Sequence, residues 1–248
     1  MGDFFAKDYT GGAFQLFGTA HLVALGIVIL AILLIVIFGK RANEKTRKTI
    51  RYTLAAILIV DEIGWHVWNS ANGTWTIQTM LPLHLCSVFV FLSAFMLVTR
   101  NYTIYEFAYF LGIAGASQAL LTPDAGIYGF PHYRFFQVML SHGCIMAAAL
   151  YMTFVEGYRP TWKSLKKVLI GANIYMMAVF FFNLAIGSNY LFIAHKPGTA
   201  SLIDLMPAWP WYILVIELLG MAVSLLLYLP FAISDWRGKK VKVEAAVE

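Results

Sequence analysis

Residues 19–39 read TAHLVALGIVILAILLIVIFG and carry no charged side chain. An α-helix rises about 1.5 Å per residue, so a stretch of this length crosses the roughly 30 Å hydrocarbon core of a bilayer. We therefore predict that this segment is a transmembrane helix. Six further apolar blocks follow it, at residues 50–69, 82–99, 104–121, 134–155, 165–187 and 210–231.

The composition of the whole chain points to the same class of protein. Of its 248 residues, 60% are hydrophobic and 12% are charged, and the mean hydropathy is +0.71. A water-soluble domain of this size needs many more surface charges. A transmembrane β-barrel would show alternating strands of about ten residues, and we find no such pattern. We predict an all-α polytopic membrane protein, a bundle of seven transmembrane helices in one domain over residues 1–236, with a polar tail over residues 237–248.

Lysine and arginine lie mostly on one side of this predicted bundle. Fifteen of the 18 fall in the loops after the first, third and fifth helices and in the C-terminal tail, whereas Lys7, Arg134 and Lys196 fall on the other side. Cytoplasmic loops of membrane proteins carry such an excess. The N-terminus is therefore predicted outside and the C-terminus in the cytoplasm. The same distribution explains the net charge of +5 without a nucleic-acid partner.

Most polar side chains within the predicted spans lie in the outer half of the bundle. Because a charged group in a span is costly unless it is paired or hydrated, this concentration indicates a polar pocket that opens outward. Glu62 and His66 could instead neutralise each other as an i, i+4 pair. The other members could join neighbouring helices by hydrogen bonds. The predicted substrate-binding groups in the spans are Asp61, Glu62, Gln118, Asn183 and Glu217.

The segment LPLHLC, residues 81–86, places a cysteine close to the start of the third predicted helix. The partial positive charge of a helix N-terminus favours the thiolate, which is the nucleophilic form of cysteine. Counted from residue 82, Cys86 lies roughly 6 Å below the outer end of its helix. We predict that Cys86 is a nucleophile, and that a histidine acts as its base.

Three histidines are candidates for that base. His142 lies on another helix and can approach Cys86 freely, and so can His66, whose ring a neighbouring carboxylate could orient. His84 is only two residues from Cys86. On a helix that spacing corresponds to about 200°, so His84 is the poorer candidate.

A zinc site is an alternative use of the same residues. His84 with Cys86, and His142 with Cys144, form two His-x-Cys pairs, and two histidines with two cysteines are a possible zinc ligand set. Side chains two residues apart on a helix point away from each other. We therefore predict no metal and no other cofactor.

Several longer stretches can be compared with known families. They are FQLFGTAHL, LPLHLC, LLTPDAGIYGFPHYRFFQVMLSHG, NYLFIAHKP, ASLIDLMPAWPWYI and LYLPF, spread from about residue 14 to residue 231. Together they resemble the YwaF-type integral membrane protein family, whose animal relatives are the transmembrane protein 164 acyltransferases. The resemblance implies lipid acyl transfer in which a cysteine carries the acyl group as a thioester. Cys86 matches that cysteine, and His142 of LSHG is the natural base. Asp124 of TPD and Asp204 of ASLID fall in family-like segments predicted outside, with structural or substrate-binding roles.

These observations favour a phospholipid-remodelling acyltransferase of a bacterial cytoplasmic membrane. Its partners would be a membrane phospholipid and a lysophospholipid, and its oligomeric state is left open. A site in the outer half cannot readily use cytosolic acyl-CoA, so the predicted acyl donor is a phospholipid of the outer leaflet. One alternative is a proton-coupled transporter, which predicts helices interrupted at mid-membrane. Another is a seven-helix receptor or sensor, which only the helix count favours.

Overall fold

The computed structural model describes residues 3–197 and 202–244, and every regular element within them is a helix. The α-helices are α1 (Thr19–Arg41), α2 (Glu44–Ala71), α3 (Leu85–Thr99), α4 (Tyr102–Phe107), α5 (Ile113–Leu121), α6 (Tyr133–Phe154), α7 (Trp162–Ile186) and α8 (Trp211–Glu244). A π-helical turn, η1 (Ala108–Gly112), joins α4 to α5 in one continuous rod. Two short 3₁₀ helices are η2 (Tyr190–Phe192) and η3 (Leu202–Leu205). The all-α prediction is confirmed for the described part of the chain.

Each predicted block corresponds to one helical rod, but several boundaries differ, among them the start of α7 at Trp162 rather than residue 165. α2 begins at Glu44 rather than residue 50, because Asn43 accepts a hydrogen bond from the backbone of Thr46 at 2.9 Å and starts the helix in a polar segment. α3 begins at Leu85 rather than residue 82. α8 continues to Glu244 rather than ending at residue 231, so the predicted tail begins within a helix and its last four residues lie outside the described part.

Five rods are long and apolar enough to cross a membrane, namely α1, Tyr102–Leu121, α6, α7 and α8 as far as Arg237. α2 is long enough but carries charged residues in its first eight positions and at Asp61 and Glu62. α3 is apolar but has only 15 residues, about 22 Å of helix. The chain is therefore an integral membrane protein whose helices lie in a lipid bilayer.

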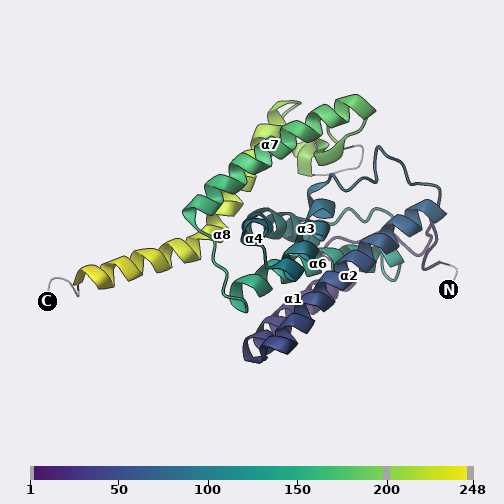
Figure 1. Cartoon of the computed structure of the whole chain (residues 1–248). Coiled ribbons are helices and arrows are strands. Elements are labelled where there is room, and N and C mark those ends of the chain that lie inside the picture. Colours follow the sequence, from purple (N-terminus) through teal and green to yellow (C-terminus); the bar gives the residue numbers. More distant parts are fainter. Residues whose placement is uncertain (1–2, 198–201, 245–248) are drawn as a thin grey trace.

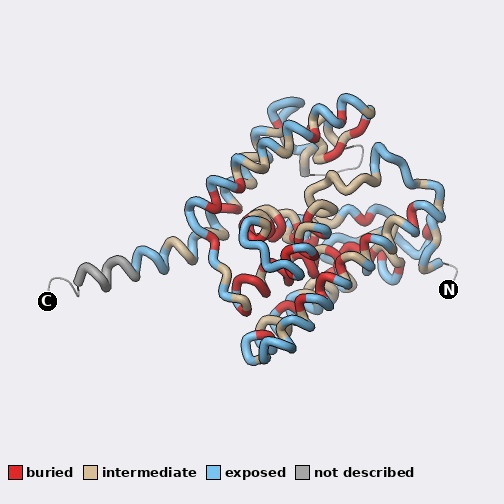
Figure 2. Tube along the Cα trace, viewed as in Figure 1, coloured by how far each residue is buried: buried red, intermediate tan, exposed pale blue. Residues whose placement is uncertain are grey.

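The buried core is centred on α6. Helices α1, α2, α3 and α5 all pack against it, and Figure 2 shows buried residues concentrated there while α1, α7 and α8 are largely exposed. Small residues let the helices approach: a Cβ on Gly143 would lie 3.0 Å from the side chain of Val28 on α1. The exposed side chains along α1 and α7 are mostly apolar, as expected for surfaces that face lipid.

The α7–α8 pair lies to one side of that core (Figure 1). A buried carboxylate holds α7 to α4, since Glu106 accepts a hydrogen bond from Ser164 at 2.6 Å and forms an ion pair with Lys167. On α8, the backbone carbonyl of Leu227 accepts a hydrogen bond from the Tyr109 hydroxyl in η1 at 2.9 Å. The pair is thus attached in part through the rod that contains the π-helical turn.

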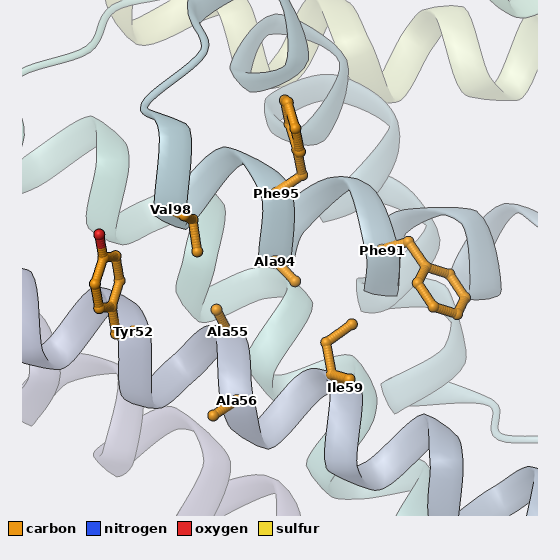
Figure 3. Close-up of a pocket in the computed structure, with 8 residues that line it drawn as sticks. All are labelled: Tyr52, Ala55, Ala56, Ile59, Phe91, Ala94, Phe95 and Val98. Atoms are coloured by element: carbon orange, nitrogen blue, oxygen red, sulfur yellow. The ribbon is translucent and has the colours of Figure 1, made fainter.

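An open groove between α2 and α3 has a volume of about 530 Å³ (Figure 3). Figure 3 shows apolar side chains and the ring of Tyr52 around it. On α3 these residues lie between Phe91 and Val98, on a different face from Cys86. This groove is therefore separate from the predicted polar pocket. Its lining residues are Tyr52, Ala55, Ala56, Ile59, Phe91, Ala94, Phe95 and Val98.

Candidate functional site

Cys86 is the second residue of α3, so its backbone lies in the first turn of the helix. No side chain caps this turn, and the backbone N–H groups of residues 85–87 have no acceptor within the described part of the chain. Such uncapped N–H groups give the helix end its partial positive charge. The predicted position of the thiol at a helix N-terminus therefore agrees with the structure.

The thiol lies in a narrow crevice between α3, α5 and α6, lined only by apolar neighbours. Ile145 lines the crevice from α6. Gly115 of α5 lies so close that a Cβ at this position would be 3.9 Å from the sulfur. The crevice is too narrow for a water molecule. The predicted wet pocket around the thiol is not present in this conformation. The lining residues are Leu85, Cys86, Phe89, Leu111, Gly112, Gly115, Ala116 and Ile145.

His142 lies one turn from the crevice on the same face of α6 as Ile145. Its Nδ1 lies 2.8 Å from the backbone carbonyl oxygen of Val138, which can only accept a hydrogen bond. Nδ1 therefore carries the proton, and Nε2 of the neutral ring keeps a free lone pair. No hydrogen bond joins Cys86 to a histidine among residues 3–197 and 202–244. Cys86 and His142, the pair predicted from the sequence, are therefore not joined by a hydrogen bond in the described structure.

A polar cluster joins α2 to α6 above the crevice. Gln137 accepts a hydrogen bond from Arg134 and donates one to the carboxylate of Asp61 at 3.0 Å. The guanidinium of Arg134 lies 4.0 Å from the centre of the Trp65 ring and donates to the backbone carbonyl of Asp124 at 3.3 Å. Of this cluster, the sequence had placed Asp61 and Asp124 in the site, whereas Arg134 and Gln137 were missed. Their spacing of three residues on one face of a helix, next to LSHG, is the signal that could have found them.

The positive charge of Arg134 connects this cluster to the predicted chemistry. It acts electrostatically on Cys86, on His142 and on the carboxylates of Asp61 and Glu62. Thus the structure brings together residues of α2, α3 and α6 that are up to 81 positions apart in the sequence.

His66 does not point at the thiol. Its Nε2 lies 3.5 Å from the carboxylate of Glu62, and its Nδ1 accepts a hydrogen bond from the indole of Trp75 at 2.9 Å. Both ring nitrogens of His66 therefore have partners. Glu62 and His66 form the i, i+4 pair that the sequence offered as the simpler interpretation.

His84 is the residue before α3, and it binds a different part of the chain. Its Nδ1 accepts a hydrogen bond from the backbone N–H of Leu191 at 3.3 Å, and its ring packs against Tyr190 and Phe192. His84 therefore fixes the start of α3 to the connection between α7 and α8. Asp124, which is exposed in its loop, acts electrostatically on His84 and Arg134.

Tyr190 holds the segment before Cys86 in place. Its buried hydroxyl accepts a hydrogen bond from Leu81 N–H at 2.9 Å and donates one to the Ile77 carbonyl at 2.7 Å. Tyr175 adds a bond of 2.9 Å to the carbonyl of Leu83. These bonds explain why α3 starts late: residues 81–84 are fixed to α7 and to the connection between α7 and α8 before the helix begins.

We expect Tyr190→Phe to lower the free energy of unfolding by about 1–3 kcal/mol, because two buried backbone groups lose their partner. Cys86 should also react faster with a membrane-permeant maleimide, because the start of α3 is less well fixed. Thermal unfolding and labelling in detergent measure both effects. Tyr52→Phe is the control, since the Tyr52 hydroxyl has no hydrogen bond within the described residues. An unchanged labelling rate in Tyr190→Phe would contradict this role.

The N-terminal segment covers the same end of the bundle. His132 caps α6 by accepting from Arg134 N–H at 3.0 Å, and its other nitrogen donates to the carbonyl of Ala6 at 3.0 Å. Burial lowers the pKa of His132, although the bond to Ala6 opposes that effect. Trp68 also donates to the Phe5 carbonyl at 2.9 Å.

Four other predicted residues do not line the crevice around the thiol. Gln118 is exposed and donates a hydrogen bond to the hydroxyl of Thr122, the residue that follows α5, at 2.5 Å. Asn183 is buried and binds the backbone of Tyr190 at 2.9 Å through both ends of its amide, so it shapes a turn. Asp204 is exposed in η3, and Glu217 is half-buried in α8.

The alternative zinc set is not assembled in the structure. Within residues 3–197 and 202–244, no three histidine, cysteine, aspartate or glutamate side chains meet as metal ligands would. His84 is bound to Leu191, His142 to Val138, and the two cysteines are free thiols.

Comparisons with known proteins add the family. The model of the TMEM164 family matches residues 16–228, which is most of the chain. An uncharacterized protein of Treponema pallidum (strain Nichols) is 24% identical over 221 residues, covering 89% of this chain and 91% of its own length. No solved structure matches the chain. Since the family model extends from the last residues before α1 into α8, this chain belongs to the TMEM164 family.

Proposed function

We propose that the protein is a membrane acyltransferase that moves a fatty acyl chain from a phospholipid to a lysophospholipid through a thioester on Cys86. One observation carries the proposal: the thiol lies in an uncapped helix N-terminus, next to the face of α6 that presents His142. Membership of the TMEM164 family supports it through the resemblance of the LPLHLC and LSHG segments.

The reaction has two balanced steps. First, Nε2 of His142 takes the thiol proton, the sulfur of Cys86 attacks the ester carbonyl carbon, and the C–O bond breaks as the proton passes to the leaving oxygen. A thioester and a lysophospholipid result. Second, the hydroxyl of an acceptor lysophospholipid attacks the thioester while His142 takes its proton. The C–S bond breaks, and the proton returns to the sulfur.

The first turn of α3 can stabilise the charge that develops on the carbonyl oxygen. Its N–H groups at residues 85–87 have no protein acceptor within the described chain. Donors that are already oriented toward a developing oxyanion typically contribute 10²–10³-fold to a rate. The same groups favour the thiolate before attack.

The closed crevice implies that α5 moves when a lipid enters. Gly112 and Gly115 form one wall of the crevice, and both belong to the rod that contains η1. A π-helical turn is a frequent site of local rearrangement in helices. We infer that α5 shifts away from α3 so that His142 and an ester can reach the sulfur.

The topology that accompanies this function is seven spans, with the N-terminus outside a bacterial cytoplasmic membrane. Gly115 lies six residues from the end of α5, about 9 Å, so the thiol is in the half of the rod nearer the N-terminal segment. In this orientation that half faces the outer leaflet. The donor is therefore a phospholipid rather than acyl-CoA.

A transfer assay tests the proposal. Purified protein in vesicles receives a phospholipid labelled in its acyl chain and an unlabelled lysophospholipid, with no acyl-CoA. We expect label to appear in newly formed diacyl lipid. Transfer that occurs only after acyl-CoA is added would contradict the outer-leaflet donor, and no transfer under either condition would contradict the function.

The transporter alternative predicted interrupted helices at mid-membrane. The rod Tyr102–Leu121 does contain the π-helical turn η1, but its sequence AYFLG carries no charged side chain. No second function is therefore proposed.

A further inference from the structure

Arg134 is a charged group that the acyl-transfer steps do not use. Its guanidinium has five N–H donors, and two of them bind Gln137 and the carbonyl of Asp124. The other three have no acceptor within the described part of the chain. Its stacking on Trp65 at 4.0 Å fixes the plane of the group.

No carboxylate pairs with this cation. Asp61, Glu62 and Asp124 all act on it electrostatically, but none of their oxygens lies within ion-pair distance among the described residues. Gln137 lies between Arg134 and Asp61, and it is Gln137 rather than Arg134 that donates a hydrogen bond to the Asp61 carboxylate. Because a charged side chain in a membrane bundle is costly without a partner, this guanidinium is suited to bind an anion.

The helix end itself does not supply an anion site. The first backbone N–H groups of α6 are occupied: Tyr133 N–H donates to the Phe4 carbonyl at 2.8 Å, and Arg134 N–H donates to His132 at 3.0 Å. Any anion at this end would therefore bind the guanidinium side chain. A planar guanidinium suits the oxygens of a phosphate, which it can bind with two parallel hydrogen bonds.

We propose that Arg134 binds the phosphodiester of the lipid substrate and so positions its ester at Cys86. This inference rests on the proposed acyl transfer and adds the residue that recognises the lipid. Arg134 lies in the first turn of α6, where a lipid headgroup would reside, and its charge reaches both Cys86 and His142. If the phosphate binds Arg134, the glycerol ester of the same lipid can extend from the headgroup level toward the thiol of Cys86.

Two substrates with the same acyl chains test the role: a diacyl phospholipid and the matching diacylglycerol, which lacks the phosphate. We expect Arg134→Gln to lower kcat/KM for acylation of Cys86 by the phospholipid about 10- to 100-fold, mainly through KM, as for the loss of a charge-assisted bond. Acylation by diacylglycerol should be unchanged, and Arg134→Lys should recover part of the loss. Lys7→Gln, which removes an exposed cation near the N-terminus, is the control. An equal loss for both substrates, or none for the phospholipid, would overturn the proposal.

A binding measurement separates this inference from the enzymatic function. In a Cys86→Ala background, native mass spectrometry compares retention of a lysophospholipid with that of the matching monoacylglycerol. We expect the lysophospholipid to be retained preferentially, and Arg134→Gln to abolish the preference. If inorganic phosphate displaces it completely, the site recognises free phosphate and the lipid assignment is wrong. If the preference depends on Arg134 but wild-type protein forms no acyl adduct, the acyl-transfer proposal fails while the phosphate site stands.

Discussion

Cys86→Ser is expected to lower acyl transfer by at least about 10³-fold. A serine hydroxyl is a far weaker nucleophile than a thiolate, and α3 offers no side-chain base in its first turn to activate it. The substitution changes one atom in a crevice that already holds the sulfur, so the fold should be retained. Initial rates of label transfer in vesicles measure the effect, and thermal unfolding checks the fold.

Cys144→Ala is the matched control for this substitution. Cys144, like Cys86, is a free thiol, but it lies on α6, where it is buried and only two residues from His142. We expect it to retain activity within a few-fold. If Cys144→Ala abolished transfer while Cys86→Ser did not, the nucleophile would have been assigned to the wrong cysteine.

The second large effect is expected for His142→Gln. Without its imidazole, the thiol has no proton acceptor on the facing side of α6, and loss of a general base typically costs 10²–10⁴-fold. A glutamine can still donate to the Val138 carbonyl and so preserves the local bond of 2.8 Å. The rate of Cys86 acylation, followed by intact mass, is the measurement.

Two other histidines show whether this loss is specific. His66 is bound to Glu62 and Trp75, so His66→Gln should change the acylation rate by only a few-fold. His195 is exposed in the loop between α7 and α8, and its substitution should have no effect. A larger loss for His66→Gln than for His142→Gln would make His66 the base.

The helices could be predicted from the sequence, but the contacts between them could not. Long apolar blocks identify helices such as α1 because the bilayer requires about 20 apolar residues. The start of α3 was predicted three residues early, because Tyr190 and Tyr175 fix the segment before it from more than 90 positions away. Hydropathy carries no information about such distant hydrogen bonds.

The candidate site was predicted only in part for the same reason. Cys86 and its place near a helix N-terminus followed from Pro82 and the apolar run. Arg134 was counted only as an external charge, although its place as the first residue of the block 134–155 marked it as a cation at the end of a membrane span. The outward polar pocket was expected to surround the thiol. Instead, the polar groups gather around Arg134 while the sulfur lies among apolar side chains.

The proposed reaction depends on Cys86 carrying the acyl chain. Wild-type protein is incubated with an isotopically labelled phospholipid, digested under acidic conditions and sequenced by tandem mass spectrometry. We predict one labelled acyl group on the peptide that contains Cys86, removed by neutral hydroxylamine as a thioester is. An acyl group on another residue, or efficient lipid transfer with Cys86 never modified, would contradict the account.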